Sequence, residues 1–161
     1  MAKNIFTAFL AVAVALLVAA LLFPIFAQSK DGPRDPELSR MKMLALGVLM
    51  YADDHDDRLP AERPWLQQVN DVYVKNLEAC RCARIPNASK SNLFGHALRA
   101  SMAGHLLGKV PHPESNIMLF DSMDLRMGAI GELEDMPNPP RVGDGSIVAY
   151  ADGHARFVRL P

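Results

Sequence analysis

The chain begins with a long apolar stretch that few polar residues interrupt. Nearly every residue at positions 5–26 is apolar, and no charged side chain occurs between Asn4 and Ser29. As a helix, these 22 residues would extend roughly 33 Å, enough to cross a hydrocarbon core of about 30 Å. A helix also satisfies its own backbone hydrogen bonds inside lipid. The pattern therefore predicts a transmembrane anchor over residues 1–27.

A cleaved signal peptide is the alternative interpretation of this segment. Lys3 provides a minimal positive region, and Ala27 is a small residue suited to cleavage. However, the apolar run is longer than the about 7–15 residues usual in signal peptides, and Ile25 fits poorly two positions before the alanine. A retained anchor is favoured.

A second apolar pattern follows a short polar break. Residues 28–36 read QSKDGPRDP and predict a juxtamembrane hinge, because proline moves the residue before it out of helical geometry. Over residues 37–52, apolar positions recur at three- and four-residue spacing, which predicts a helix with one buried face. That face comprises Leu38, Met41, Ala45, Val48, Leu49 and Ala52.

The middle of the chain gives weaker patterns. A short helix around Trp65 is expected to cover the core, and residues 91–109 predict loops around a short strand or helical turn. The compact apolar run at residues 116–121 predicts a buried strand. Residues 121–141 are acidic and rich in glycine and proline, so they predict a loop.

The strongest local signal lies near the end of the chain. Asp152 and Gly153 separate two apolar-rich segments and predict a hairpin with a two-residue turn, because glycine accepts positive φ without steric cost. The register of such a turn places two pairs on the side that receives the helix: Val148 with Phe157, and Tyr150 with Ala155.

These elements predict an α+β fold. An N-terminal transmembrane helix would precede an amphipathic helix packed on a small antiparallel β-sheet. The about 135 residues after the anchor suffice for one modest core and not for two domains. We therefore expect a single globular domain over residues 37–161.

Charge and cysteine content exclude several classes of protein. The net charge of −1 offers no basic stripe for nucleic acid. Cys80 and Cys82 are too few for a disulfide scaffold, and no second Cys-x-Cys pair completes a metal or redox site. Two small, half-buried thiols are the expected outcome.

An acidic cluster closes the predicted helix. Its four carboxylates surround His55 and are candidates for a cation site, with calcium as the ion: Asp53, Asp54, Asp56 and Asp57. The central glycine and distal glutamate of a helix–loop–helix calcium site are missing, so a solvated helix end is favoured.

No motif indicates an enzyme. The sequence contains no nucleophile elbow, phosphate-binding glycine loop or zinc-binding helix. His96, His105 and His112 do not lie in a metal-binding arrangement, and no site is predicted there. We predict no catalytic residue, no cofactor-binding residue and no cofactor.

The order of motifs resembles a known family. The chain is similar to bacterial pilin-like proteins, which have a prepilin-type N-terminus and a C-terminal motif of His, nine residues and Asp-Gly. The similarity runs from the anchor to the last strand, except for a poorly matched centre at residues 61–110. The segments that carry it are 22–28 (LFPIFAQ), 43–53 (MLALGVLMYAD), 57–60 (DRLP), 113–122 (PESNIMLFDS), 148–154 (VAYADGH) and 157–158 (FV).

The chain departs from the family pattern in three ways. The glycine–phenylalanine cleavage junction is absent, and the anchor contains no glutamate. Val142 stands where the family has the histidine before Asp152 and Gly153, and the hinge interrupts what would be one long helix. Pro24 matches the proline within the anchor of many pilins.

The resemblance implies a single-pass protein of the inner membrane with its domain on the extracytoplasmic side. Lys3 alone precedes the apolar run, whereas four basic residues follow it, so the positive-inside rule by itself would place the domain in the cytoplasm. We follow the resemblance, because a downstream globular domain dilutes that bias.

Two functions follow from these expectations. The first is a non-enzymatic subunit or accessory protein of a type IV pilus or a type II secretion apparatus. Its partners would be the lipid bilayer and like subunits or assembly proteins, contacted through the N-terminal helix. The alternative is an anchored extracytoplasmic module, derived from a pilin fold, that binds a ligand or a cation.

Overall fold

The computed structural model describes residues 35–141 and 143–159. Within these ranges no helix has the length and apolar character needed to span a bilayer. The predicted anchor over residues 1–27, its Pro24 and most of the hinge lie outside the described residues. The domain itself combines helices with one five-stranded sheet, which confirms the α+β class.

Helix α2 (Pro36–Asp54) is the longest element of the domain. Its first turn is well specified, because Pro36 occupies the first helical position and the Asp35 side chain accepts a hydrogen bond from the Glu37 backbone N–H at 3.0 Å. Five apolar side chains on one face are fully buried, and the predicted helix over residues 37–52 is confirmed: Met41, Leu44, Ala45, Val48 and Ala52.

Short helical segments follow α2. Helix α3 (Trp65–Val69) buries Trp65, Leu66 and Val69 in the core, as the sequence led us to expect for this region. A π-helical turn, η1, continues directly from α3. The remaining helical turns are η1 (Asn70–Val74), η2 (Leu77–Cys80), η3 (Leu107–Lys109) and η4 (Leu133–Asp135).

The sheet has the strand order β3-β1-β2-β4-β5. Its strands are β1 (His96–Arg99), β2 (Ile117–Asp121), β3 (Ala129–Gly131), β4 (Gly145–Tyr150) and β5 (Ala155–Arg159). Strand β2 confirms the strand predicted at residues 116–121.

The sheet is mixed, so the prediction of a purely antiparallel sheet is wrong for one pair of strands. β3 runs parallel to β1, whereas the other three neighbouring pairs are antiparallel. β3 lies within residues 121–141, which we predicted to be a loop. It has only three residues, and the Trp65 indole N–H donates to the Ala129 carbonyl at 3.2 Å, a contact that no local pattern encodes.

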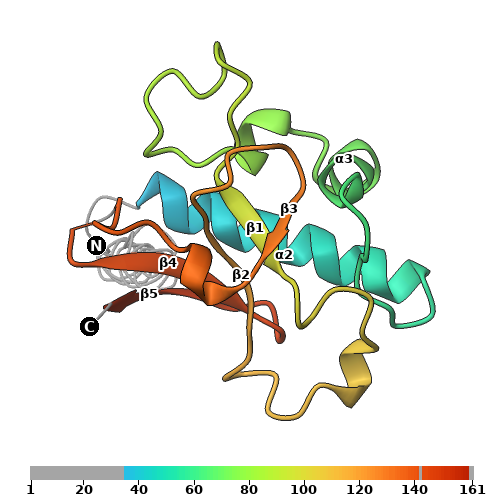
Figure 1. Ribbon diagram of the computed structural model, residues 1–161. Coiled ribbons are helices and arrows are strands. Elements are labelled where there is room, and N and C mark those ends of the chain that lie inside the picture. Colours follow the sequence, from blue (N-terminus) through green and yellow to red (C-terminus); the bar gives the residue numbers. More distant parts are fainter. Residues whose placement is uncertain (1–34, 142, 160–161) are drawn as a thin grey trace, which may run out of the picture. The chain divides into compact units, whose positions relative to one another are not determined.

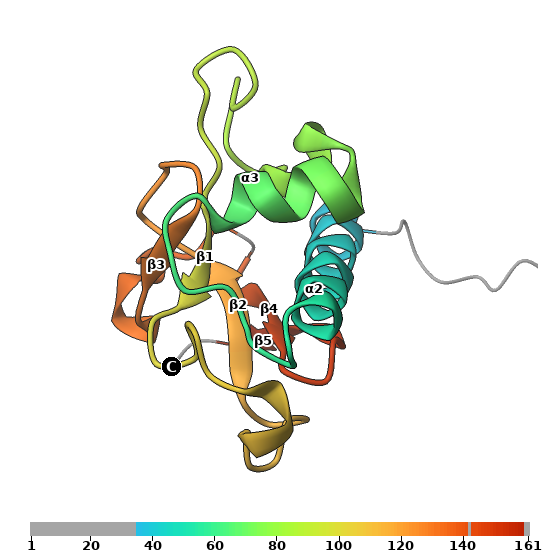
Figure 2. The same cartoon turned by 90° about the vertical axis from the view of Figure 1, so that its right-hand side faces the viewer.

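The two faces of the sheet are covered differently. Figure 1 shows α2 crossing the sheet, and Figure 2 shows it to one side of the strands. α2 and α3 share the main core with the inward side chains of β1, β2 and β4. The opposite face holds a smaller cluster that includes Phe120, Val148 and Tyr150. Leu133 and Met136 pack against this cluster, so the acidic segment after β2 closes the second face.

The β4–β5 hairpin is present, but its register differs from the predicted one. Val148 pairs with Arg156 and Ala149 with Ala155, because the turn contains three residues instead of two. The Gly153 N–H donates to the Tyr150 carbonyl, and the Tyr150 N–H to the His154 carbonyl, both at 2.9 Å. Gly153 has φ of +89°, as expected for a type I turn followed by a left-handed residue.

This one-residue shift exchanges the two faces of β4. Ile147, Ala149 and Ala151 belong to the core beneath the helices, whereas Val148 and Tyr150 face the smaller cluster. The predicted placement of Val148 and Tyr150 towards the helix is therefore wrong, as a period of two residues requires when the register slips by one.

Gly153 lies against Leu49 of α2, so we expect alanine at this position to destabilise the domain more than alanine at an uncrowded glycine. A Cβ at Gly153 would lie 2.7 Å from Leu49 Cδ1, whereas a Cβ at Gly143, also at positive φ, would meet nothing within 4 Å. We expect Gly143→Ala to lower the free energy of unfolding by about 1–2 kcal/mol through backbone strain alone. Gly153→Ala should lower it by about 1 kcal/mol more, because it also overpacks the turn against α2.

Urea denaturation of the two full-length variants in mild detergent measures this difference. Equal losses of stability in the two variants would show that the turn does not rest on Leu49.

Candidate functional site

A buried cluster of three ionisable side chains lies where α2, the segment after η2 and β1 meet. Glu37, Cys82 and His96 are each exposed by no more than 1%. One ligand-type atom from each of them lies within 4.8 Å of the other two. The shortest contact is 2.5 Å, between Glu37 Oε1 and His96 Nε2. Buried groups of this kind are rare unless they are paired, so the Glu37–Cys82–His96 cluster is the candidate site.

The hydrogen bonds of the cluster define which atoms donate. His96 Nδ1 lies 3.2 Å from the Cys80 carbonyl oxygen, which can only accept, so Nδ1 carries a proton. The Ala83 N–H donates to Glu37 Oε2 at 2.5 Å. The second carboxylate oxygen of Glu37 therefore remains for the imidazole.

Glu37 is ionised at neutral pH. Burial raises the pKa of its carboxyl, but the hydrogen bond and positive charge of His96, with the Ala83 N–H, outweigh burial and hold that pKa below its usual range. An ionised Oε1 can only accept, so His96 Nε2 must donate to it. The two side chains form a buried imidazolium–carboxylate pair.

A second ion pair, between the buried Asp121 and the partly buried Arg141, lies beside the cluster. Asp121 is directly opposite His96 in the β1–β2 ladder, and its carboxylate is bound by the Arg141 guanidinium. Arg141 Nη2 also donates to the Ser122 carbonyl at 2.9 Å. Burial raises the pKa of the Asp121 carboxyl, while the charges of Arg141 and His96 oppose that rise.

Both cysteines are fully buried and reduced, not half-buried as the sequence suggested. Burial raises the pKa of the Cys80 thiol to about 11. Burial and the nearby carboxylates of Asp121 and Glu37 raise the pKa of the Cys82 thiol to about 12. Both thiols are therefore neutral at physiological pH, and neither is an activated nucleophile.

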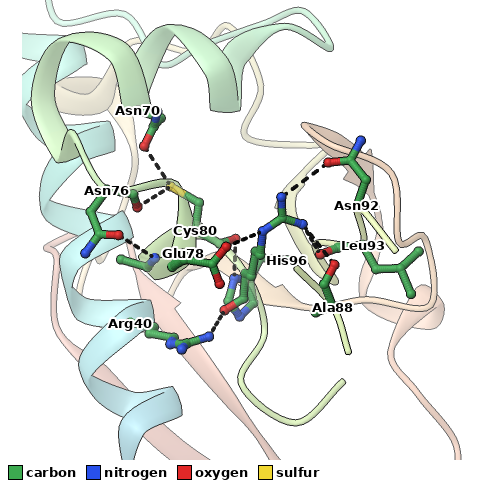
Figure 3. Close-up of polar contacts among 11 residues, drawn as sticks. Arg40, Asn70, Asn76, Glu78, Cys80, Ala88, Asn92, Leu93 and His96 are labelled. Carbon is green, nitrogen blue, oxygen red and sulfur yellow. Dashed lines mark hydrogen bonds and ion pairs between the residues drawn. The ribbon is translucent and has the colours of Figure 1, made fainter. Parts of the chain in front are cut away.

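Arg81, between the two cysteines, fixes the segment that carries Cys82. Its partners Ala88, Asn92 and Leu93 are labelled in Figure 3. Its guanidinium donates to the Ala88 and Leu93 carbonyls at 3.1 and 2.8 Å and lies 4.2 Å from the centre of the Phe94 ring. Arg40 of α2 donates to the Arg81 carbonyl at 3.0 Å. The buried arginine thus ties the loop before β1 to the helix.

The four acidic residues predicted from the sequence do not form a group close enough to share an ion. Asp54 accepts a hydrogen bond from the Tyr73 hydroxyl at 2.8 Å, and Asp57 accepts one from the Gly108 N–H at 2.6 Å. Asp53 and Asp56 are exposed. Within the described residues, the one group of three such side chains close enough to share an ion is the Glu37–Cys82–His96 cluster.

Asp152 and Gly153 lie in the β4–β5 turn. The Asp152 carboxylate accepts a hydrogen bond from the His154 backbone N–H at 3.0 Å. These contacts account for the two residues as turn formers.

The sequence alone does not predict the cluster. Glu37 has an ordinary place as an acid in the first turn of a helix, and no site is predicted at His96. Glu37 and Cys82 are 45 positions apart, and Cys82 and His96 are 14 apart, so no local motif joins them. The fold alone brings them together.

Comparison with known proteins gave no match: no family model, no curated protein and no solved structure resembles this chain at a significant level.

The Glu37–His96 pair makes a prediction about stability. Glu37→Ala should lower the free energy of unfolding by about 3–5 kcal/mol, because it leaves the buried His96 Nε2 and the Ala83 N–H without partners. Glu37→Gln should cost far less at pH 7, because its amide can donate to a neutral His96 and still accept from Ala83. Denaturation of both variants at pH 7 measures the difference.

The same pair predicts that the free energy of unfolding falls at acid pH. The folded-state pKa of Glu37 lies below its ordinary value of 4.5, so the stabilisation is present above that pH and is lost as pH falls through the folded-state pKa. The Glu37→Gln variant should lack this part of the loss. If the stability of Glu37→Gln falls at acid pH as steeply as that of the wild type, this would argue against an ionised Glu37.

The buried thiols predict that the free energy of unfolding falls at alkaline pH. Thiols with an ordinary pKa of 9.0 ionise in the unfolded chain, while Cys80 and Cys82 keep their protons to about 11 and 12 in the folded chain. Their stabilisation is therefore complete below pH 9 and falls as pH rises, by up to about 1.4 kcal/mol per pH unit for each thiol. Cys82→Ala should make the slope between pH 9 and 11 shallower by about that amount. An unchanged slope would contradict a buried, neutral Cys82.

Proposed function

We propose that this chain is a non-enzymatic, membrane-anchored subunit or accessory protein of a pilus or secretion apparatus. Its domain would lie on the extracytoplasmic side of the inner membrane. The proposal joins the predicted anchor, which lies outside the described residues, to the architecture of the domain that follows it.

The order of elements supports the proposal. α2 starts at Pro36, the last residue of the predicted hinge, and packs its buried face on a sheet. The described part of the chain ends in a β-hairpin whose turn contains Asp152 and Gly153. A helix following an apolar N-terminus, then a sheet closed by an Asp-Gly hairpin, is the arrangement that the resemblance to pilin-like proteins implies.

An exposed apolar stripe on α2 is the observation that supports an assembly role. Met43, Leu46 and Met50 are exposed by 43%, 57% and 54% of their surfaces. Their spacing of three and four residues places them on one side of the helix, away from the buried face. A helix with apolar residues on two faces is suited to pack against a second helix as well as its own sheet.

A second copy of this chain is the partner that the proposal names. Methionine and leucine on a helix surface form contacts without strict geometry, which suits packing of identical subunits side by side. Alanines in the predicted anchor, at positions 11–20, would allow the same neighbours to approach closely within the membrane.

Cysteine crosslinking of the full-length chain in native membranes tests the assembly role. We expect Leu46→Cys to give disulfide-linked dimers on mild oxidation, because equivalent stripes meet in neighbouring subunits. Cysteines placed at Ala11 and Ala15 should crosslink in the same way. The native Cys80 and Cys82 are buried and should not contribute.

The matched control is Ser89→Cys, a nearly isosteric change at an exposed loop position. It should remain monomeric, and a membrane-impermeant maleimide should label it in intact spheroplasts if the domain is extracytoplasmic. Monomeric protein from every variant, or equal dimerisation of Leu46→Cys and Ser89→Cys, would remove the assembly role. Labelling of Ser89→Cys only after lysis would reverse the orientation.

A further inference from the structure

We propose that Glu37 Oε1, Cys82 Sγ and His96 Nε2 together bind one zinc ion, a site that goes beyond the proposed role in assembly. The three atoms come from α2, from the segment after η2 and from β1. An ion bound by them would crosslink three parts of the fold that are distant in sequence.

The ligand set fits zinc by its chemistry. Carboxylate oxygen, thiolate sulfur and imidazole nitrogen are its three common protein ligands, and zinc imposes little geometric preference of its own. Calcium and magnesium prefer oxygen ligands alone, so a sulfur and a nitrogen among three ligands exclude them. The acidic cluster at the end of α2 offers mainly carboxylate oxygens and carries no such inference.

The distances require only small adjustments. Around a tetrahedral zinc with bonds of about 2.0–2.3 Å, neighbouring ligand atoms lie about 3.3–3.8 Å apart. Here the three atoms lie within 4.8 Å of one another, and Glu37 and His96 are 2.5 Å apart across a shared proton. Zinc would replace that proton, moving Oε1 and Nε2 apart while the sulfur approaches.

The charge balance favours replacement of protons by Zn²⁺ in this buried cluster. Without metal, the cluster holds an imidazolium, a carboxylate and a neutral thiol, with a net charge of zero. Binding of Zn²⁺ releases two protons, one from His96 Nε2 and one from Cys82 Sγ, and leaves a neutral imidazole, a carboxylate and a thiolate. The net charge is again zero, so the ion brings no uncompensated charge into the interior.

The surroundings of the ligands already have the form of a metal site. A zinc-bound histidine usually donates its other ring N–H to a carbonyl or carboxylate, which fixes the ring and its tautomer. His96 Nδ1 lies 3.2 Å from the Cys80 carbonyl, and the Glu37 oxygen not assigned to zinc accepts from the Ala83 N–H. Arg81 holds the segment that supplies Cys82.

Cobalt titration of the full-length chain, purified in detergent under reducing conditions and stripped with a chelator, tests the site. We expect one Co²⁺ per chain, with a thiolate-to-cobalt charge-transfer band in the near ultraviolet that Zn²⁺ removes by displacement. In weak buffer at pH 7, zinc should release about two protons per chain, one from each group named above. It should also raise the melting temperature as its concentration rises, whereas Ca²⁺ should not.

Cys80 provides a matched control, since it is equally buried, two positions away and outside the cluster. Cys82→Ser should lose the charge-transfer band, and Cys80→Ser should keep it. Glu37→Gln should fold, because its amide can maintain both hydrogen bonds, but should bind zinc on the order of a hundredfold more weakly or worse, since loss of even an outer partner costs about 10–100-fold.

The absence of a charge-transfer band in folded wild-type protein would overturn the proposal. So would equal bands in Cys82→Ser and Cys80→Ser, or wild-type zinc affinity in Glu37→Gln. If Cys82→Ser does not fold, Glu37→Gln decides the question by itself.

Discussion

The packing of one face of α2 on the sheet is the contact on which the rest of the domain depends. Five side chains of the helix are fully removed from water, and they meet the inward residues of the strands in one continuous core. At about 1.5–3 kcal/mol for each large apolar side chain buried, this interface supplies a major share of the stability of a domain this small. The loops, the turn at Gly153 and the second sheet face are all arranged around it.

The parts of the fold that the sequence made predictable are those encoded by local patterns. The stripe of apolar residues in α2, the run at β2 and the turn residues before β5 each carry their signal within a few positions. β1 and β3 could not be predicted in the same way. β1 begins with a histidine and ends with an arginine, and β3 has three residues whose position depends on a hydrogen bond from Trp65.

The Glu37–Cys82–His96 cluster could not be predicted from local sequence patterns, for a different reason. Neither Glu37 nor His96 is unusual in its own segment, and an acid in a first helical turn has an ordinary explanation. Only the register of β1 against β2, together with the path of the loop after η2, brings imidazole, carboxylate and thiol into contact. The predicted hairpin register was wrong for a related reason. Asp-Gly suits both a two-residue and a three-residue turn, and the choice between them exchanges the faces of the strand.

The place of Glu37 in the first turn of α2 has a mechanical consequence. Tension applied to the chain ahead of residue 35 enters the domain through that turn, which the Glu37 carboxylate fastens to β1 and to the Ala83 N–H. Peeling the helix from its first residue must therefore break buried polar contacts before any apolar ones. Buried polar contacts therefore secure the domain at the end where a force on the preceding chain would arrive.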